Sequence, residues 1–320
     1  MTDTHSLAGS TPRTIAVLGL GPMGAAIAAA ADTRGYRVVA WNRRPKTLGD
    51  IGFEHDTAVT LASTPRDAAS DADLVVVCVR NHDASRLLLD QIAPESRGRI
   101  VVNVSTGTPG EAADSASHAA QLGVRYVTGA IMVPTPMVGT DDCFVIYAGA
   151  SEDLAEASYF FDVMNGTSDV VGDDHAVPPA LDLAMLDIYF SGMYAHLHAT
   201  ALARAHGIEA SRFLPYAQGI ADTLRGSLPD LTTAMERRRY DAGEASLEMC
   251  LSFLEHIVES SRDAGIDPGI AELVRTASAR AMQRWPGNTD WDVVAEHFLA
   301  PPHATSERAP QDPETAKTPV

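Results

Sequence analysis

Three glycines near the start of the chain have the spacing of a dinucleotide-binding turn. Gly19, Gly21 and Gly24 follow the apolar run 15–18 and precede the helix-forming run 25–31. The first glycine of such a strand–turn–helix permits a tight turn, the second lets a pyrophosphate approach the backbone, and the third lets the helix pack on the sheet. The helix also offers unpaired N–H groups to phosphates. The pattern predicts a cofactor loop made of Gly19, Leu20, Gly21, Pro22, Met23 and Gly24.

The residues that follow the expected strand 37–41 indicate which dinucleotide binds. An NAD enzyme carries an acid there, which holds the ribose 2′-hydroxyl. Here the position holds Asn42, and Arg43, Arg44 and Lys46 come next. Guanidinium and ammonium groups attract a 2′-phosphate, whereas an acid would repel it. The alternative is a solvated basic loop, which is less expected in so acidic a chain, and we therefore predict NADPH as cofactor.

Composition limits the partners. Among 320 residues, 42 are acidic and 24 are basic, which gives a net charge of −18. This balance argues against nucleic acid and anionic membranes, since both bind basic patches. Three scattered cysteines and the absence of Cys/His ligand spacing predict free thiols and no metal site. Without a signal-peptide core or an apolar run of about 20 residues, we expect a soluble, cytoplasmic protein that acts on a small molecule.

Two patterns of secondary structure follow each other along the chain. From residue 14 to about 172, apolar runs alternate with helical segments, and the central runs are continuously apolar, as in strands buried on both faces. This alternation predicts an α/β domain with a doubly wound parallel sheet. The expected strands are 15–18, 37–41, 74–79, 100–104, 125–127, 144–147 and 170–171, and 83–91 and 110–122 are expected helices.

After residue 174 the strand pattern stops. Pro178 and Pro179 can open a helix, and no further proline occurs before His206. That helix is apolar on nearly all sides and therefore must be covered on every side. Because the helices expected near 210–225, 230–240, 246–264, 269–284 and 290–298 form too small a domain to cover it, we expect an intertwined homodimer. The predicted divisions are 1–12 disordered, 13–174 NADP-binding, 175–207 interdomain helix, 208–299 helical domain and 300–320 disordered.

Taken together, the motifs along the chain resemble those of a known family, the imine reductases and reductive aminases within the β-hydroxyacid dehydrogenase group. The resemblance implies a Rossmann domain, a long interdomain helix and a helical domain exchanged in a dimer. It also implies NADPH-dependent reduction of a C=N bond, such as that of a cyclic imine, by hydride transfer. The matching motifs are Gly19–Gly24, Trp41–Arg43, Val77–Val79, Val102–Pro109, Gly129–Met132, Asp182–Leu186, His196–Ala199, Ser246–Leu247, His256–Glu259 and Gly265–Asp267.

The long helix carries the residues to which the resemblance assigns the chemistry. Hydroxyacid dehydrogenases of this group have a lysine at its start, but this helix contains none. Asp182 matches the family position that faces the amine nitrogen, and a carboxylate there would stabilise a cationic iminium. The alternative is an acid that only favours the helix dipole.

Eight residues after Asp182, the family has a Tyr or Asp as proton donor, whereas this chain has Phe190, which donates nothing. At 100° per residue, Tyr189 lies about 20° from Asp182 around the helix, and we predict it as the substitute donor. An ordinary core aromatic, with water as the proton source, is the alternative. Asp187 and Tyr194 lie about 140° and 120° away and are expected to point elsewhere.

The remaining site residues follow from strand ends and family position. Ser105 and Thr106 close a strand at its carboxyl end, where open sheets bind ligands, and Val79 and Arg80 end the preceding one. All four are expected at the cofactor. The resemblance also implies a substrate pocket made of Met132, Met185, Phe190, Met193, Met235 and Tyr240. Two other functions stay open: a β-hydroxyacid or other carbonyl dehydrogenase, and a catalytically silent NADP-binding protein.

Overall fold

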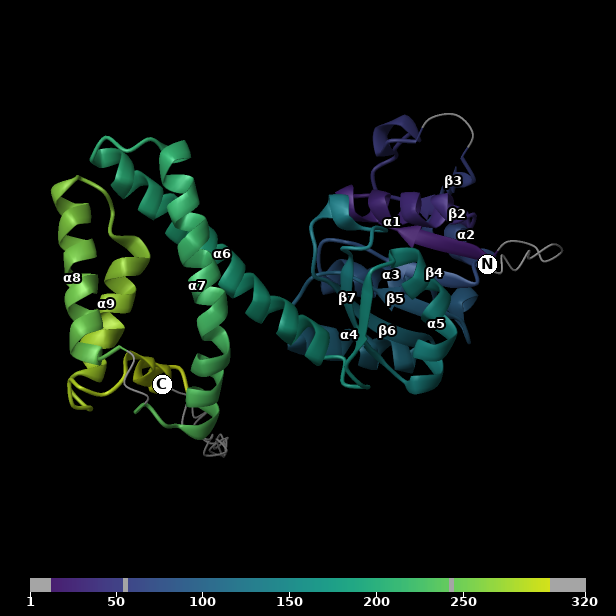
Figure 1. Ribbon diagram of the computed structural model, residues 1–320. Coiled ribbons are helices and arrows are strands. Elements are labelled where there is room, and N and C mark those ends of the chain that lie inside the picture. Colours follow the sequence, from purple (N-terminus) through teal and green to yellow (C-terminus); the bar gives the residue numbers. More distant parts are fainter. Residues whose placement is uncertain (1–12, 54–56, 242–244, 300–320) are drawn as a thin grey trace, which may run out of the picture. The chain divides into compact units, whose positions relative to one another are not determined.

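The computed structural model describes residues 13–53, 57–241 and 245–299 (Figure 1). The segments 1–12 and 300–320, for which we predicted disorder, lie outside the described residues. The chain divides into two compact units, one ending at Asp187 and the other beginning at Ile188. The division lies within helix α6, Val177–Ala205, whose length agrees with the expected long helix.

The first unit alternates strands and helices, which confirms the predicted α/β class (Figure 1). Its elements up to residue 96 are β1 (Thr14–Leu18), α1 (Pro22–Thr33), β2 (Arg37–Trp41), η1 (Gly49–Ile51), β3 (Val59–Leu61), α2 (Pro65–Ser70), β4 (Leu74–Val77) and α3 (His82–Ser96). They are followed by β5 (Ile100–Asn103), α4 (Pro109–Gln121), β6 (Arg125–Ile131), η2 (Thr135–Met137), β7 (Phe144–Gly149), α5 (Ser151–Met164) and β8 (Thr167–Val170).

The eight strands form one sheet in the order β3-β2-β1-β4-β5-β6-β7-β8. All neighbours are parallel except β6 and β7, which pair antiparallel. Strand β3 was not predicted, because three residues at a sheet edge are too short for a pattern. Strand β6 extends past Val127, where the prediction ended it, because residues up to Ile131 pair with β7. Gly129 lies close to Val104 and the Tyr147 ring, where a Cβ would be too near.

Helices cover both faces of the sheet. Ile15 and Val17 of β1 point into one buried cluster with α1 and α5. Ala16 and Leu18, the alternate residues, point into a second cluster with α2, α3 and α4. Each fully buried aliphatic side chain of this kind contributes about 1.5–3 kcal/mol. The central strands are thus held on both sides, and their carboxyl ends are fixed in position.

Local signals explain where the helices beside the sheet begin. The Asn81 side chain accepts a hydrogen bond from the Ala84 N–H and caps α3. Thr108 and Glu111 form a reciprocal capping box at the start of α4. Asn81 and Thr108 lie a few residues after β4 and β5, and their caps therefore fix the ends of the loops that follow these strands.

The second unit is helical and contains the rest of α6 (Figure 1). Its other elements are α7 (Ala210–Arg237), α8 (Leu247–Asp263), α9 (Gly269–Ala281) and the 3₁₀ segment η3 (Trp291–His297). The two helices expected at 210–225 and 230–240 are a single helix, although it contains Pro215 and Pro229. A proline removes one backbone hydrogen bond but does not always end a helix. The expected last helix is a 3₁₀ segment.

The core of the second unit is small. It consists of Leu247, Ala281, Val293 and Val294, with partly buried aromatic side chains packed around it. Large apolar side chains along α6 and α7 are exposed instead. Among the described residues, each helix is too short or too polar to cross a bilayer.

Candidate active site

The glycine loop joins β1 to α1 in the geometry that a dinucleotide needs. Gly19 has φ of +104°, and a Cβ there would collide with the carbonyl oxygen of Cys78. A Cβ on Gly24 would collide with the Gly19 carbonyl oxygen. A Cβ on Gly21, by contrast, would meet nothing within 4 Å. Packing therefore requires glycine at positions 19 and 24, whereas the space beside Gly21 is open to a ligand.

The segment after β2 holds this loop. The Gly19 N–H donates to the Trp41 carbonyl at 2.8 Å, and the Leu20 N–H donates to Asn42 Oδ1 at 2.9 Å. The Lys46 ammonium donates to the Leu20 carbonyl at 2.6 Å. Lys46, which we predicted at the phosphate, thus contacts the loop backbone. Sequence reasoning did not detect this contact, because it depends on how the chain turns back after Arg44.

A pocket of about 600 Å³ opens in front of the loop. Most of the predicted cofactor residues line it: Gly19, Gly21, Pro22, Met23, Gly24, Asn42, Arg43, Val79 and Arg80. Leu87, Leu88 and Gln91 of α3 also line it, and the sequence analysis missed them. Leu87 is an exposed leucine on α3, and its local sequence pattern does not distinguish it from a leucine that packs on the sheet.

A second pocket, of about 220 Å³, shares Met23, Cys78, Val79 and Arg80 with the first. Ser105, Thr106 and Asp182 also line it. The structure therefore brings the predicted carboxylate and the predicted strand-end residues to one cavity of the first unit. Asp182 reaches it from the start of α6, where Pro178 and Pro179 are buried. Burial raises the pKa of the Asp182 carboxyl above its usual value.

Buried polar side chains hold the walls of this pocket. The Ser105 hydroxyl accepts the Val79 N–H at 3.2 Å, and the Ser105 N–H donates to Asn103 Oδ1 at 3.0 Å. The Asn103 amide donates to the hydroxyls of Ser85 and Tyr126. The carboxyl ends of β4 and β5 are thereby tied to each other. The sequence analysis named Ser105 and missed Asn103, whose role depends on partners far along the chain.

Two histidines belong to the same region, and sequence reasoning identified neither. His82 lines the second pocket, and its Nδ1 lies 2.9 Å from the Ser115 hydroxyl. His175 Nδ1 lies 2.9 Å from the hydroxyl of Thr128, which also lines that pocket. Burial lowers the pKa of both imidazoles below the ordinary value.

The six predicted substrate-pocket residues do not form one cluster within either unit. Met132 and Met185 belong to the first unit and line neither of its two pockets described above. The other four belong to the second unit: Phe190, Met193, Met235 and Tyr240. The Tyr240 hydroxyl donates to Glu296 at 2.7 Å, and burial together with this bond raises the pKa of Tyr240 to about 12.

The predicted donor, Tyr189, is also in the second unit. Its ring lies edge-on to that of Phe190, with centroids 5.6 Å apart, and both rings are largely exposed. Tyr194, which we expected to point elsewhere, lies against Gly269 at the start of α9. Tyr189 is thus exposed in a single copy of the chain, and its role stays a prediction.

Comparisons with known proteins match both units. A family model described as the NAD binding domain of 6-phosphogluconate dehydrogenase matches residues 14–172. Another, described as NADPH-dependent reductive aminase-like, C-terminal domain, matches residues 174–300. The chain belongs to the imine reductase and reductive aminase family.

Individual relatives of this imine reductase family agree. An NADPH-dependent reductive aminase of Aspergillus oryzae is 27% identical over 291 residues, which cover 89% of this chain and 96% of the relative. A Streptomyces aurantiacus imine reductase structure is 27% identical, has a TM-score of 0.82, and is matched over 90% of this chain and 100% of its own. The structure of a Myxococcus stipitatus imine reductase in complex with NADP⁺ gives the same identity, coverage and TM-score.

The first unit fits the NADPH that this oxidoreductase family uses. The open face of Gly21 and the N-terminus of α1 suit a pyrophosphate, and Arg43 at the pocket rim suits a 2′-phosphate. The residues present therefore agree with the predicted cofactor. The comparisons do not favour the hydroxyacid dehydrogenase or the silent binding protein.

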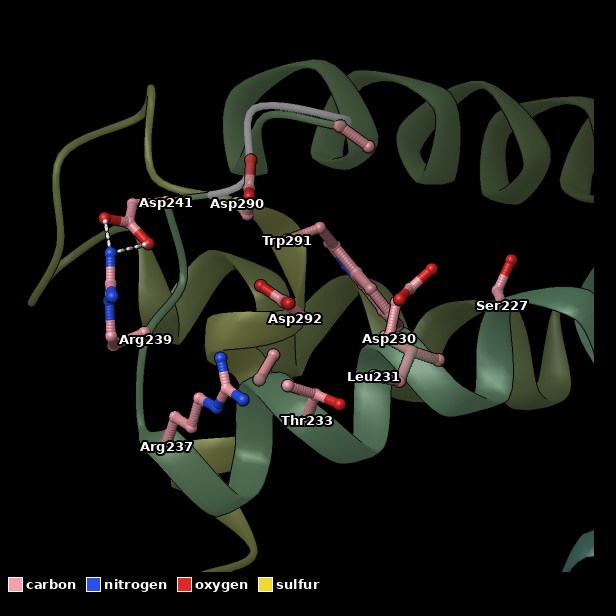
Figure 2. A pocket seen from close by; sticks show the side chains of 12 residues that line it. Ser227, Asp230, Leu231, Thr233, Arg237, Arg239, Asp241, Asp290, Trp291 and Asp292 are labelled. Atoms are coloured by element: carbon pink, nitrogen blue, oxygen red, sulfur yellow. Dashed lines mark hydrogen bonds and ion pairs between the residues drawn. The ribbon is translucent and has the colours of Figure 1, made fainter.

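The second unit of this imine reductase family member has a larger cavity of its own, about 650 Å³ (Figure 2). Asp230 and Arg237 of α7 and Trp291 of η3 line it, and Arg239 pairs with Asp241 at 3.1 Å on its border. It contains no residue of the glycine loop. Among the described residues, no group of His, Cys, Asp and Glu side chains has the arrangement of a metal site.

Proposed function

We propose that this protein reduces the C=N bond of a cyclic imine or iminium to an amine, with NADPH as reductant. The observation that carries the proposal is the shared cavity of the first unit. There the Asp182 carboxyl lies with Ser105 and Thr106, next to the pocket of the glycine loop.

The chain's own groups have a clear task in such a reaction. NADPH, when bound, supplies a hydride to the imine carbon, and the nitrogen gains one proton to give the amine. We infer that the Asp182 carboxylate stabilises the cationic nitrogen, which a lysine ammonium would repel. The lack of a lysine in α6 supports this choice over carbonyl reduction.

Cofactor selection is proposed to come from the residues after β2. Arg43 and Arg44 are exposed and free to meet a 2′-phosphate, and Asn42 carries no charge that would repel it. Lys46 is proposed to keep the loop in place through the Leu20 carbonyl. Val79, Arg80, Ser105 and Thr106 are proposed at the nicotinamide end.

We further propose a homodimer that exchanges its helical domain, with domain limits of 13–174, 175–207 and 208–299. Exposed apolar side chains along α6 and α7 support this, because one copy leaves them in water. Phe190, Met193, Met235 and Tyr240 would then complete the substrate pocket with Met132 and Met185. Tyr189 is proposed as a contributor to proton transfer from α6.

The cytoplasm is the proposed compartment. All three cysteines are unpaired, and the Cys78 and Cys143 thiols have raised pKa values through burial. Free thiols of this kind are typical of a reducing compartment.

The test is to mix the purified protein with NADPH and a five-membered cyclic imine, and to follow cofactor absorbance together with amine formation. We expect amine to form in step with NADPH loss, and no reaction of a hydroxyacid with NADP⁺. Turnover of the hydroxyacid alone would overturn the proposal.

A further inference from the structure

The reaction needs a proton at nitrogen for every hydride at carbon, and the chain has Phe190 at the family's donor position. Asp182 cannot both remain a carboxylate that stabilises the cation and be the source of the proton. Tyr189, the contributor proposed above, belongs to the second unit and does not line the cavity of Asp182. The main proton source is therefore sought among the residues that line this cavity. The following inference rests on the proposed function.

Thr128 and His175 provide such a source in the first unit, at the wall of the cavity. Thr128 lies on β6, is almost fully buried, and lines the cavity that contains Asp182. Its hydroxyl is 2.9 Å from His175 Nδ1. His175 is half-buried and lies in the exposed segment before α6, next to Asp173 and Asp174. One end of the pair thus reaches the cavity and the other lies close to water.

The hydrogen bond between them changes direction with the charge of the imidazole. When His175 is neutral with its proton on Nε2, Nδ1 accepts the Thr128 hydroxyl proton. When His175 is cationic, Nδ1–H donates to the Thr128 oxygen, and the hydroxyl proton is then free to point into the cavity. Protonation of the histidine therefore turns Thr128 into a donor toward the cavity.

We propose that His175 and Thr128 form a proton relay that protonates the substrate nitrogen in place of the missing side chain at position 190. In this step the Thr128 hydroxyl gives its proton to nitrogen and takes one from His175 Nδ1–H. His175 recovers a proton from water. Carbon gains a hydride and nitrogen a proton, so that imine, NADPH and one proton from the solvent become amine and NADP⁺. Thr128 touches the substrate, and His175 acts through it.

The charged surroundings of His175 define the expected pH dependence. Burial is the largest influence and lowers the pKa, while Asp174, Asp173 and Asp153 oppose it. The Tyr126 ring packs against the imidazole, with centroids 5.7 Å apart. The relay is charged only below the folded pKa, which lies under 6.5. We therefore expect kcat to rise as pH falls through the pKa of His175, which burial holds below the ordinary histidine value.

The test compares Thr128→Val, Thr128→Ser and His175→Gln in the full chain. Valine has nearly the same shape without the hydroxyl, and serine keeps the hydroxyl. Glutamine can hold Thr128 but cannot titrate. With a five-membered cyclic imine, we expect Thr128→Val and His175→Gln to lose about tenfold or more in kcat. We expect Thr128→Ser to stay within about threefold. Both slow variants are expected to lose the low-pH rise of kcat, and to show a larger solvent deuterium isotope effect.

Two further measurements separate the relay from damage to the fold. NADPH affinity, measured by fluorescence, is expected to stay within about twofold in all variants. In the cofactor-free protein, the histidine NMR signal absent from His175→Gln is expected to titrate at lower pH than that of an exposed histidine, and to shift in Thr128→Val. His118→Gln, which removes a surface histidine paired with Asp90, is the control and is expected to match the wild type.

The outcomes are distinct. Amine formation by the wild type, together with an unchanged kcat and pH profile in His175→Gln, overturns the relay and leaves the proposed function intact. Equal losses in Thr128→Ser and Thr128→Val also overturn it. If the wild type forms no amine from any imine, the proposed function and the relay both fall.

Discussion

The two units of the chain bury their apolar side chains to very different extents. In the first, Ile15, Leu74 and Phe160 are fully buried between the sheet and its helices. In the second, Leu197 on α6 is 68% exposed and Ile220 on α7 is 67% exposed. The first unit therefore builds its core within a single copy, and it holds the cofactor loop, Asp182 and the proposed relay. The second unit leaves large apolar side chains of α6 and α7 exposed to water in a single copy.

The difference between the two units indicates that they have different roles in the proposed enzyme. Chemistry that needs fixed positions is placed at the carboxyl ends of strands held on both faces. The helical unit supplies apolar surface that only another surface can complete, and we propose that a second copy does so. Each of the following substitutions changes either the site of the first unit or the helices of the second.

The largest effect is expected from charging the apolar face of α7. Tyr216→Asp with Ile220→Asp puts four carboxylates into the proposed dimer interface, where burial of each replaced side chain stabilises by about 1.5–3 kcal/mol. We expect dimer dissociation to increase by at least about 1,000-fold, measured by light scattering over a dilution series. NADPH affinity is expected to change by less than about threefold.

Gln218→Glu is the matched control, since it adds a charge on the same helix at an exposed polar position. It is expected to leave the dimer intact. If light scattering shows that the wild-type protein is a monomer at micromolar concentration, the proposal that a second copy covers the apolar face of α6 and α7 is wrong.

The next largest effect is expected at Asp182. Asp182→Ala removes the carboxylate that stabilises the cation, and we expect kcat to fall roughly 100-fold, and not less than tenfold. Asp187→Asn, about 140° around the same helix, is the control and is expected to retain kcat. NADPH affinity is measured in both variants, and an unchanged value shows that the cofactor-binding unit is folded. An unchanged kcat in Asp182→Ala would exclude Asp182 from the mechanism.

Cofactor preference gives a smaller and more selective effect. Replacing Arg43 and Arg44 by serine removes two charge-assisted contacts to the 2′-phosphate. We expect NADPH to bind about tenfold more weakly, while NADH binding stays the same. Arg34→Ser, on the far end of α1, controls for lost charge. Equal weakening of both cofactors would show that these arginines shape the loop and do not read the phosphate.

A substitution of Lys46 is expected to affect both cofactors equally, unlike the substitutions of Arg43 and Arg44. Because its ammonium holds the Leu20 carbonyl, Lys46→Met is expected to weaken NADPH and NADH alike, by about fivefold, the value of one hydrogen bond. Both dissociation constants are measured by fluorescence titration. A loss confined to NADPH would return Lys46 to the phosphate-binding role that the sequence suggests.

The smallest effect is expected at Tyr189. If the proton arrives through Thr128, Tyr189→Phe lowers kcat by less than about threefold, measured with the same cyclic imine. Phe190→Tyr, which restores the family's donor position, is the informative companion and is expected to make kcat less dependent on His175. A loss at Tyr189→Phe as large as that at Asp182→Ala would make Tyr189 the donor.

Local sequence signals predicted a large part of this architecture. The Gly19–Gly24 loop, the central strands and the long helix α6 all follow from short-range patterns, and the structure has them nearly where expected. Asp182 could be proposed from the absence of lysine in α6 and from its family position. The alternation of apolar runs was enough for the fold class.

The parts that could not be predicted depend on contacts between distant residues. His175 meets Thr128 across 47 positions of sequence, and Asn103 meets Tyr126 across 23. No local pattern distinguishes these side chains from solvated ones. The continuity of α7 through Pro229 also escaped prediction, because proline discourages a helix but packing decides whether it ends.

The most direct test of the central claim is to follow the label from NADPH deuterated at the transferred C4 position. The account predicts that a five-membered cyclic imine yields amine with one deuterium at the former imine carbon for each NADPH consumed, as read by mass spectrometry and NMR. Cofactor oxidation without deuterium in the amine, or no amine at all, would contradict it.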